Sequence, residues 1–296
     1  MRDHPLNVQY GRRVWSVDEK MLFSDPYEFP GLEIEIDWPS KELNIVGYLN
    51  TTSVRQRILT RLGGRSLRTY TLLIYYLVYF PLIKYLEQAR GWGLLHAGAI
   101  SSEKGAMIFS GMPGSGKSSF IFKALQDPAL RIVSDNLVFH DGRSIYAFPE
   151  PIHVNMDNQQ SYSDPPEEYI SPTGRTFSHD RQDYSIDPAF RAWKAQPHTL
   201  IFIGLSNESR LKALSHQQAM RRLLSNNAVA KEVIAYQQFG SILDLISPHK
   251  IGQVQILNLL NNLVNSLTCF ELQVKRETDP QKLGDIVMEQ LSLLNF

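Results

Sequence analysis

The feature that most constrains this sequence is the stretch at residues 111–118, which reads GMPGSGKS. It fits G-x-x-x-x-G-K-[ST], the pattern of a phosphate-binding loop, or P-loop. Its glycines lack a Cβ, so the backbone can turn tightly and point successive N–H groups at a polyphosphate. The pattern predicts that Lys117 reaches the β- and γ-phosphates of a nucleotide and that the hydroxyl of Ser118 binds Mg²⁺.

The segments on either side of the loop have the composition that this motif requires. Residues 106–110 (AMIFS) are a short apolar run, which predicts a buried strand. Residues 118–125 predict a helix, whose N-terminal dipole would add to the attraction for phosphate. The alternative is a chance Gly/Ser-rich turn, and the order strand, loop, helix argues against it. We therefore expect nucleotide contacts from Gly111, Met112, Pro113, Gly114, Ser115, Gly116, Lys117, Ser118 and Ser119.

Two neighbouring strands are expected to carry polar side chains to the loop. Residues 94–100 predict a strand that contains His96, which alone would be an ordinary core histidine. Residues 130–136 predict a strand that ends at Asp135. An acidic residue in this position commonly presents a second ligand to Mg²⁺. The sequence therefore predicts Ser118 and Asp135 as the Mg²⁺ ligands.

The part of the chain from residue 91 to residue 296 is predicted to form an α/β domain with a mixed sheet flanked by helices. The fully apolar run at 198–205 suits the centre of such a sheet. Asp141-Gly142 between two apolar runs predicts a hairpin. Residues 208–265 are expected to be mostly helical, followed by a last strand at 268–274 and a last helix up to residue 296.

Residues 1–90 are predicted to form a separate, small α+β segment that caps the nucleotide domain or recognises a partner. Alternating residues at 32–37 and 43–49 predict two paired strands, and residues 51–90 predict helices. The apolar run at 69–83 is shorter than the roughly 18–20 residues that span a bilayer. We expect it to be a buried helix and a membrane contact to be unlikely, with an interfacial membrane segment as the alternative.

Residues 156–185 are rich in polar residues and proline and predict a long loop. Long loops near nucleotide sites often close over the site or bind the acceptor. A solvated loop without a role is the alternative. Its candidate contacts to phosphate or acceptor are Arg175, His179, Asp180, Arg181 and Asp183.

The charge balance and the single cysteine restrict the other possibilities. Lys+Arg and Asp+Glu number 30 each, so no global positive field exists to attract nucleic acid. Cys269 cannot form an intramolecular disulfide or a multi-cysteine metal site, and a reducing, cytoplasmic compartment is the simplest expectation. We expect Cys269 to be a small buried side chain rather than a nucleophile. The sequence leaves open whether the chain forms a homo-oligomer.

Three stretches carry a resemblance to a known family. They are HAGA at 96–99, the P-loop, and IVSDN at 132–136 followed by FPEPI at 148–152. Together they resemble the HPr kinase/phosphorylase superfamily, and especially its HPr-kinase-related branch. The resemblance implies a P-loop kinase core that uses ATP and Mg²⁺, with an imidazole beside the γ-phosphate and an acidic pair that handles Mg²⁺ and the acceptor proton. It assigns the catalytic roles to His96, Lys117 and Asp135.

One position departs from the family pattern. The family usually has a second acidic residue where this chain has Asn136, whose amide cannot act as a general base. Asp135 then serves both roles, or the loop is shifted by one residue. The pattern that recognises HPr itself is not apparent. We expect Mg²⁺-dependent transfer of a phosphoryl group from ATP or another donor to a hydroxyl, foremost a serine-type acceptor on a peptide, protein or small molecule. The alternative is a nucleotide-binding regulatory module with little or no transfer activity.

Overall fold

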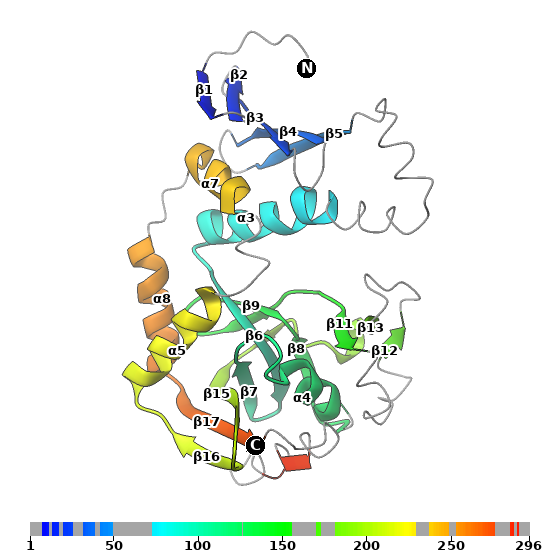
Figure 1. The fold of residues 1–296 in the computed structure, drawn as a ribbon, viewed down its shortest axis with the longest axis vertical. Helices are drawn as coiled ribbons and strands as arrows, with labels where there is room; N and C mark the ends of the chain where they lie inside the picture. The colour runs from blue at the N-terminus through cyan, green and yellow to red at the C-terminus, as the bar shows by residue number, and fades with distance from the viewer. Residues whose placement is uncertain are drawn as a thin grey trace. The chain divides into compact units, whose positions relative to one another are not determined.

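The computed structural model describes residues 8–11, 14–17, 20–25, 32–38, 42–49, 73–125, 127–155, 170–172, 181–228, 237–248, 253–275, 285–286 and 289. The chain separates into two units (Figure 1). Unit 1 consists of Met1–Gly91 and Glu232–Gly252, and unit 2 of Trp92–Lys231 and Gln253–Phe296. The sequence predicts one division of the chain, after residue 90, but the chain returns to unit 1 over Glu232–Gly252.

Unit 1 contains a five-stranded antiparallel sheet whose strands follow one another in chain order. Strands β4 and β5 pair from Leu32–Leu49 to Asp37–Asn44, which confirms the two paired strands expected here. Along β4 the side chains alternate between buried and half-buried, because only one face of the sheet is covered. The strands are β1 (Val8–Gly11), β2 (Val14–Val17), β3 (Lys20–Asp25), β4 (Leu32–Asp37) and β5 (Asn44–Leu49).

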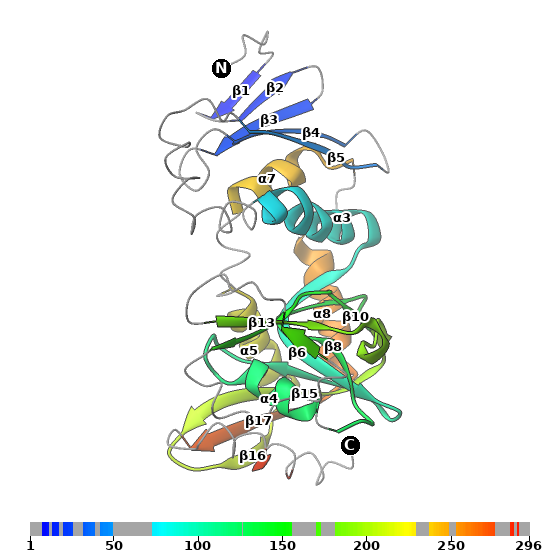
Figure 2. The same cartoon turned by 90° about the vertical axis from the view of Figure 1, so that its right-hand side faces the viewer.

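Helices cover one face of this sheet (Figure 2). They are the short π-helix η1 (Tyr75–Tyr79), α3 (Phe80–Arg90) and α7 (Gln237–Ile246). The ring of Phe23 on β3 packs against Tyr76 at 6.0 Å and Phe239 at 5.6 Å, so all three segments share one core. The apolar run expected to be a buried helix is helical from residue 73 onward, and residues 69–72, like the predicted helix before them, lie outside the described part. In the described chain, no helix has the length and apolar character needed to cross a membrane.

Unit 2 is built on a mixed sheet flanked by helices, which confirms the predicted α/β class. In this sheet β7, β15 and β17 run parallel to one another, and β6 runs antiparallel to β7. The order is β14-β10-β9-β6-β7-β15-β17-β16, and β8 also pairs with β6. The strands are β6 (Gly93–Ser102), β7 (Gly105–Ser110), β8 (Arg131–Ser134), β9 (Leu137–His140), β10 (Ile145–Ala147), β14 (Lys194–Ala195), β15 (Pro197–Ser206), β16 (Arg210–Ala213) and β17 (Thr268–Lys275).

The two faces of this sheet bury different helices. Helix α4 (Lys117–Ala124) contributes Phe120 to a cluster that contains Phe109 of β7, with ring centroids 4.2 Å apart. Helices α5 (His216–Ala228) and α8 (Gln253–Asn265) pack on the other face, in a cluster that includes Ile108. Neighbouring residues of β7 therefore enter opposite cores, as the alternation along a strand requires. This is why the strand before the loop is a continuous apolar run.

The predictions for Cys269 and for the Asp141-Gly142 hairpin are both confirmed. Cys269 is buried on β17, and burial raises the pKa of its thiol to about 11, so the expectation of a small core side chain is confirmed. Strands β9 and β10 pair antiparallel around the Asp141-Gly142 turn, with Ile145 opposite His140. Gly142 has φ of 87°, a left-handed conformation that glycine adopts without strain.

Two expectations about secondary structure in unit 2 are wrong in part. Residues 156–185 were expected to be a loop, but Arg181 and Asp183 lie on β13, which pairs with β11 and β12 in a separate three-stranded sheet. Tyr184 of β13 packs against Phe122 at 5.4 Å, and Tyr184 and Ile186 are both buried in the core that contains Phe122. These strands are β11 (Ile152–Asn155), β12 (Ile170–Pro172) and β13 (Arg181–Ile186). The other loop candidates, Arg175, His179 and Asp180, lie outside the described residues.

The second partial error concerns the region expected to be mostly helical. Residues 210–213 form β16, an edge strand paired with β17. Leu211 packs against the core, while Arg210 donates a hydrogen bond to Gln273 at 2.6 Å. A four-residue polar edge strand has too few apolar residues to show a strand pattern in the sequence. The predicted last helix lies almost entirely outside the described residues.

We predict that Gly98→Ala destabilises unit 2. A Cβ at Gly98 would overlap Ile121 of α4 and lie 2.7 Å from the carbonyl oxygen of Asp135. Overpacking of this kind costs roughly 1–3 kcal/mol in the free energy of unfolding, measured by urea denaturation. Gly204→Ala is the matched control, because a Cβ on this strand glycine meets nothing within 4 Å. Equal stability of the two variants would contradict the described packing of β6 against α4.

Candidate functional site

The stretch 111–118 forms a tight turn between β7 and α4. Gly114 and Gly116 have φ of 80° and 95°, values that favour glycine. The N–H of Ser115 donates to the carbonyl of Met112 at 3.1 Å, which closes the turn. Helix α4 begins at Lys117, and no side chain caps its N-terminus. The N-cap residue, Gly116, has no side chain that could cap the first N–H groups of α4, as is common at a helix start that binds an anion.

Gly111 is required by a close approach of the chain to itself. A Cβ at this position would overlap the hydroxyl oxygen of Ser115 and lie 2.8 Å from the carbonyl oxygen of Ile203 on β15. The loop thus folds back over the end of β7 and against β15. Glycine is therefore needed for two separate reasons: there is no space for a Cβ at Gly111, and Gly114 and Gly116 adopt positive φ.

The ammonium group of Lys117 lies inside the loop. Its Nζ donates to the carbonyl oxygens of Gly111 at 2.8 Å and Met112 at 3.2 Å, and the side chain is buried. A lysine seldom becomes buried unless it is paired or hydrogen-bonded. The loop therefore holds a positive charge against two of its own carbonyl oxygens. Ser115 is also buried, whereas Met112 is exposed.

The pairing of β6 brings His96 beside the loop. Ala97 lies opposite Ser110, the last residue of β7, so His96 is level with the start of the loop. On its other edge β6 pairs with β9, where His96 lies opposite Leu137. His96 is buried, and by the alternation along β6 its side chain lies on the same face of the sheet as Gly98, the face covered by α4.

Asp135 lies in the bend between β8 and β9, next to β6. The N–H of Ala97 donates to the carbonyl of Asn136 at 3.0 Å, so the bend is fixed to the residue that follows His96. Ser134 anchors the bend from the other side, since its hydroxyl both donates to the carbonyl of Phe148 at 2.9 Å and accepts from its N–H at 2.7 Å. The side chain of Asp135 is buried.

The structure thus brings the start of the P-loop, His96 and Asp135 to the same end of neighbouring strands in the middle of the sheet. From the pairing alone, the start of the P-loop, His96 and the bend that carries Asp135 lie side by side in that order. Within the described chain no group of three or more His, Cys, Asp or Glu side chains is arranged to hold a metal. Mg²⁺ usually keeps several waters and needs only one or two protein carboxylates, so a Mg²⁺ site does not require such a group.

Sequence reasoning missed a buried arginine next to this bend. Arg191 donates to the carbonyl oxygens of Val133 at 3.0 Å and Glu150 at 3.3 Å. Burial lowers the pKa of Arg191, and the charge of Glu150 opposes that shift. The N–H of Ala192 donates to Ile132 at 2.8 Å, so this segment continues the sheet beside β8. Arg191 therefore supports the backbone that leads to Asp135, and no motif in the sequence marks it.

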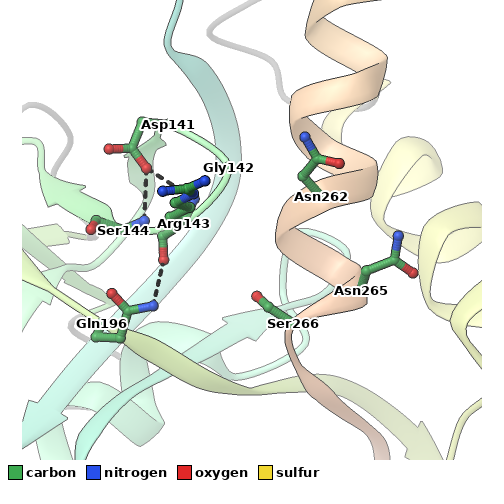
Figure 3. Close-up of a pocket in the computed structure, with 8 residues that line it drawn as sticks. All are labelled: Asp141, Gly142, Arg143, Ser144, Gln196, Asn262, Asn265 and Ser266. Atoms are coloured by element: carbon green, nitrogen blue, oxygen red, sulfur yellow. Dashed lines mark hydrogen bonds between the residues drawn. The ribbon is translucent and has the colours of Figure 1, made fainter.

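A separate pocket of about 580 Å³ contains none of the predicted site residues (Figure 3). It lies between the Asp141 hairpin and α8. Burial tends to raise the pKa of Asp141, but hydrogen bonds from Ser144, Tyr146 and Arg143 outweigh it and hold the pKa below its usual value. That carboxylate is thus engaged in fixing the hairpin. The lining residues are Asp141, Gly142, Arg143, Ser144, Gln196, Asn262, Asn265 and Ser266.

No protein-family model matches the sequence, and no curated protein matches it either. The functional interpretation therefore depends on the motif and on the arrangement of the loop, His96 and Asp135.

We predict that His140 makes the protein less stable in mild acid. This buried residue faces Gly93, and burial lowers its pKa from 6.5 to about 4. Below pH 6.5 the unfolded chain binds a proton that the folded chain does not, so stability falls as the pH drops towards 4. Between pH 7 and pH 5 the free energy of unfolding should fall about 2 kcal/mol more in the native protein than in His140→Leu. Parallel urea denaturation at the two pH values measures this difference, and equal losses would contradict the assignment.

Proposed function

We propose that the protein is a Mg²⁺-dependent phosphotransferase that moves a phosphoryl group from ATP to a hydroxyl-bearing acceptor. The acceptor class proposed is a serine-type hydroxyl on a peptide, a protein or a small molecule. The observation that carries the proposal is the buried ammonium of Lys117 inside a glycine loop at the start of α4. The position of His96 and Asp135 on neighbouring segments, and the resemblance to HPr-kinase-related proteins, support it.

The loop supplies groups that suit a polyphosphate. The backbone N–H groups at the start of a helix and the positive end of its dipole attract anions, and α4 begins at Lys117. Lys117 now bonds to carbonyl oxygens of its own loop, and phosphate oxygens are better acceptors for an ammonium ion. We expect Lys117 to exchange these carbonyls for the β- and γ-phosphates when a nucleotide binds. Phosphoryl transfer depends mainly on such positioning and charge neutralisation.

Three side chains near the loop would take part in the transfer itself. Ser118 and Asp135 would hold Mg²⁺, which neutralises phosphate charge when bound. Asp135 would also orient the acceptor hydroxyl or take its proton, because Asn136 cannot act as a base. His96 would contact the γ-phosphate. A cytoplasmic location belongs to the same proposal.

The second candidate is a regulatory module that binds a nucleotide but transfers little or nothing. Asn136 favours it, since an amide stands where related kinases have a second acid. Incubation with γ-labelled ATP and a panel of serine-containing peptides and free hydroxy amino acids separates the two. Labelled acceptor supports the transferase, and tight nucleotide binding without any labelled acceptor supports the module.

We predict that Lys117→Met greatly weakens MgATP binding and abolishes transfer. Loss of a charged hydrogen-bond donor costs about 1.5–3 kcal/mol, or roughly a ten- to hundredfold rise in Kd. Titration with a fluorescent ATP analogue measures Kd, and the labelled-ATP assay measures transfer. Lys104→Met, at the exposed turn between β6 and β7, is the matched control and should behave like the native protein. Full binding and activity in Lys117→Met would refute the site.

A further inference from the structure

Two consecutive asparagines at the end of α5 contact the strands that flank the P-loop. Asn226 donates from Nδ2 to the hydroxyl of Ser110 at 3.0 Å, and both side chains are buried. Asn227 accepts at Oδ1 from the N–H of His96 at 2.9 Å and donates from Nδ2 to the carbonyl of Leu94 at 3.2 Å. Ser110 is the residue before the loop, and His96 is the histidine beside it.

The contacts of Asn227 lie where β6 and β7 separate. These strands pair from Ser102–Gly105 to Ala97–Ser110, and then the chain leaves β7 to form the P-loop. Beyond that point the N–H of His96 and the carbonyl of Leu94 point to the side that β7 has vacated, because polar groups two residues apart on a strand point the same way. The side-chain amide of Asn227 occupies this place as a peptide group of a neighbouring strand would.

Asn226 acts one step away, on the strand that enters the loop. The side chain of Ser110 lies on the α5 face of β7, since its neighbour Phe109 enters the opposite core, where α4 packs. The Asn226–Ser110 bond therefore fixes the last residue of β7 from behind. The two asparagines therefore bond to the two strands at the point where they separate. Asn226 bonds to Ser110 on β7, and Asn227 bonds to His96 on β6.

We propose that Asn226 and Asn227 are positioning residues for the phosphate site. Asn227 fixes the backbone of His96, and Asn226 fixes the point where β7 enters the loop. This inference rests on the proposed function, because positioning matters only if the loop binds a nucleotide. Neither asparagine needs to touch the nucleotide. Displacement of a catalytic group by about 1 Å can cost about a hundredfold in rate, so a fixed backbone at His96 has a direct kinetic value.

The first test measures the hydrogen bond itself. In Asn227→Ala the amide proton of His96 should exchange with solvent at least about tenfold faster, because it loses its acceptor. The amide of Ala97, which bonds to Asn136, should keep its protection and serves as the internal control. Asn227→Asp keeps an oxygen at the acceptor position and should preserve most of the protection of His96. Unchanged exchange of His96 in Asn227→Ala overturns the inference.

The second test separates positioning from folding and from nucleotide binding. The rate of labelled-phosphate transfer at saturating MgATP should fall about ten- to hundredfold in Asn227→Ala, while its Kd for MgATP changes less than about threefold. Asn227→Asp should recover part of the rate. Asn226→Ala should mainly raise the Kd, because it loosens the entrance to the loop. Asn258→Ala, an exposed asparagine on α8, is the matched control and should change neither value.

The outcomes distinguish this inference from the proposed function. A native protein that neither binds MgATP nor transfers phosphate refutes the proposed function, and the positioning roles fall with it. A native protein that does both, with Asn227→Ala and Asn226→Ala equal to it, leaves the proposed function intact and refutes the inference. If Asn227→Ala does not fold, Asn227→Leu decides, because leucine has a similar volume and no acceptor for the N–H of His96. A lowered transfer rate with an unchanged Kd in this variant supports the inference, and a native rate contradicts it.

Discussion

Strand β6 forms backbone hydrogen bonds with β7 along one edge and with β8 and β9 along the other, and the candidate site depends on this pairing. The register on the first edge sets His96 level with the end of β7, where the P-loop begins. On the second edge, the bond from Ala97 to Asn136 sets the bend with Asp135 at the same level. A slip of β6 by one residue would turn His96 to the opposite face of the sheet. The close fit of Gly98 against α4 opposes such a slip.

The P-loop holds a local positive charge on Lys117. The chain has no net charge, so attraction for an anion has to come from local groups. In the proposed site, Lys117 and the N-terminus of α4 would supply it in one place. The carbonyls of Gly111 and Met112 hold the ammonium in the loop, which limits the entropy that a flexible lysine would lose on meeting a phosphate.

The sequence predicted the parts of this arrangement that local patterns encode. The glycines and lysine of the loop, the apolar strand before it, the helix after it and the Asp141-Gly142 hairpin are all recognisable from neighbouring residues. Tertiary contacts decided the rest. The mostly polar strand β13 is anchored by Tyr184 and Ile186, which enter the core beside Phe122. Arg191 matters because it bonds to a strand that is distant in sequence. The roles of Asn226 and Asn227 could not be predicted, since nothing in the neighbouring sequence shows that β6 has an open edge for an amide.

The most direct test of the account is a crystal structure of the protein grown with Mg²⁺ and a non-hydrolysable ATP analogue. The account predicts that the Nζ of Lys117 leaves the carbonyl oxygens of Gly111 and Met112 and bonds to the β- and γ-phosphates. It also predicts that the hydroxyl of Ser118 binds Mg²⁺ and that the carboxylate of Asp135 binds the same ion, either directly or through a water. A loop without nucleotide, with Lys117 still bonded to Gly111, would contradict the central claim.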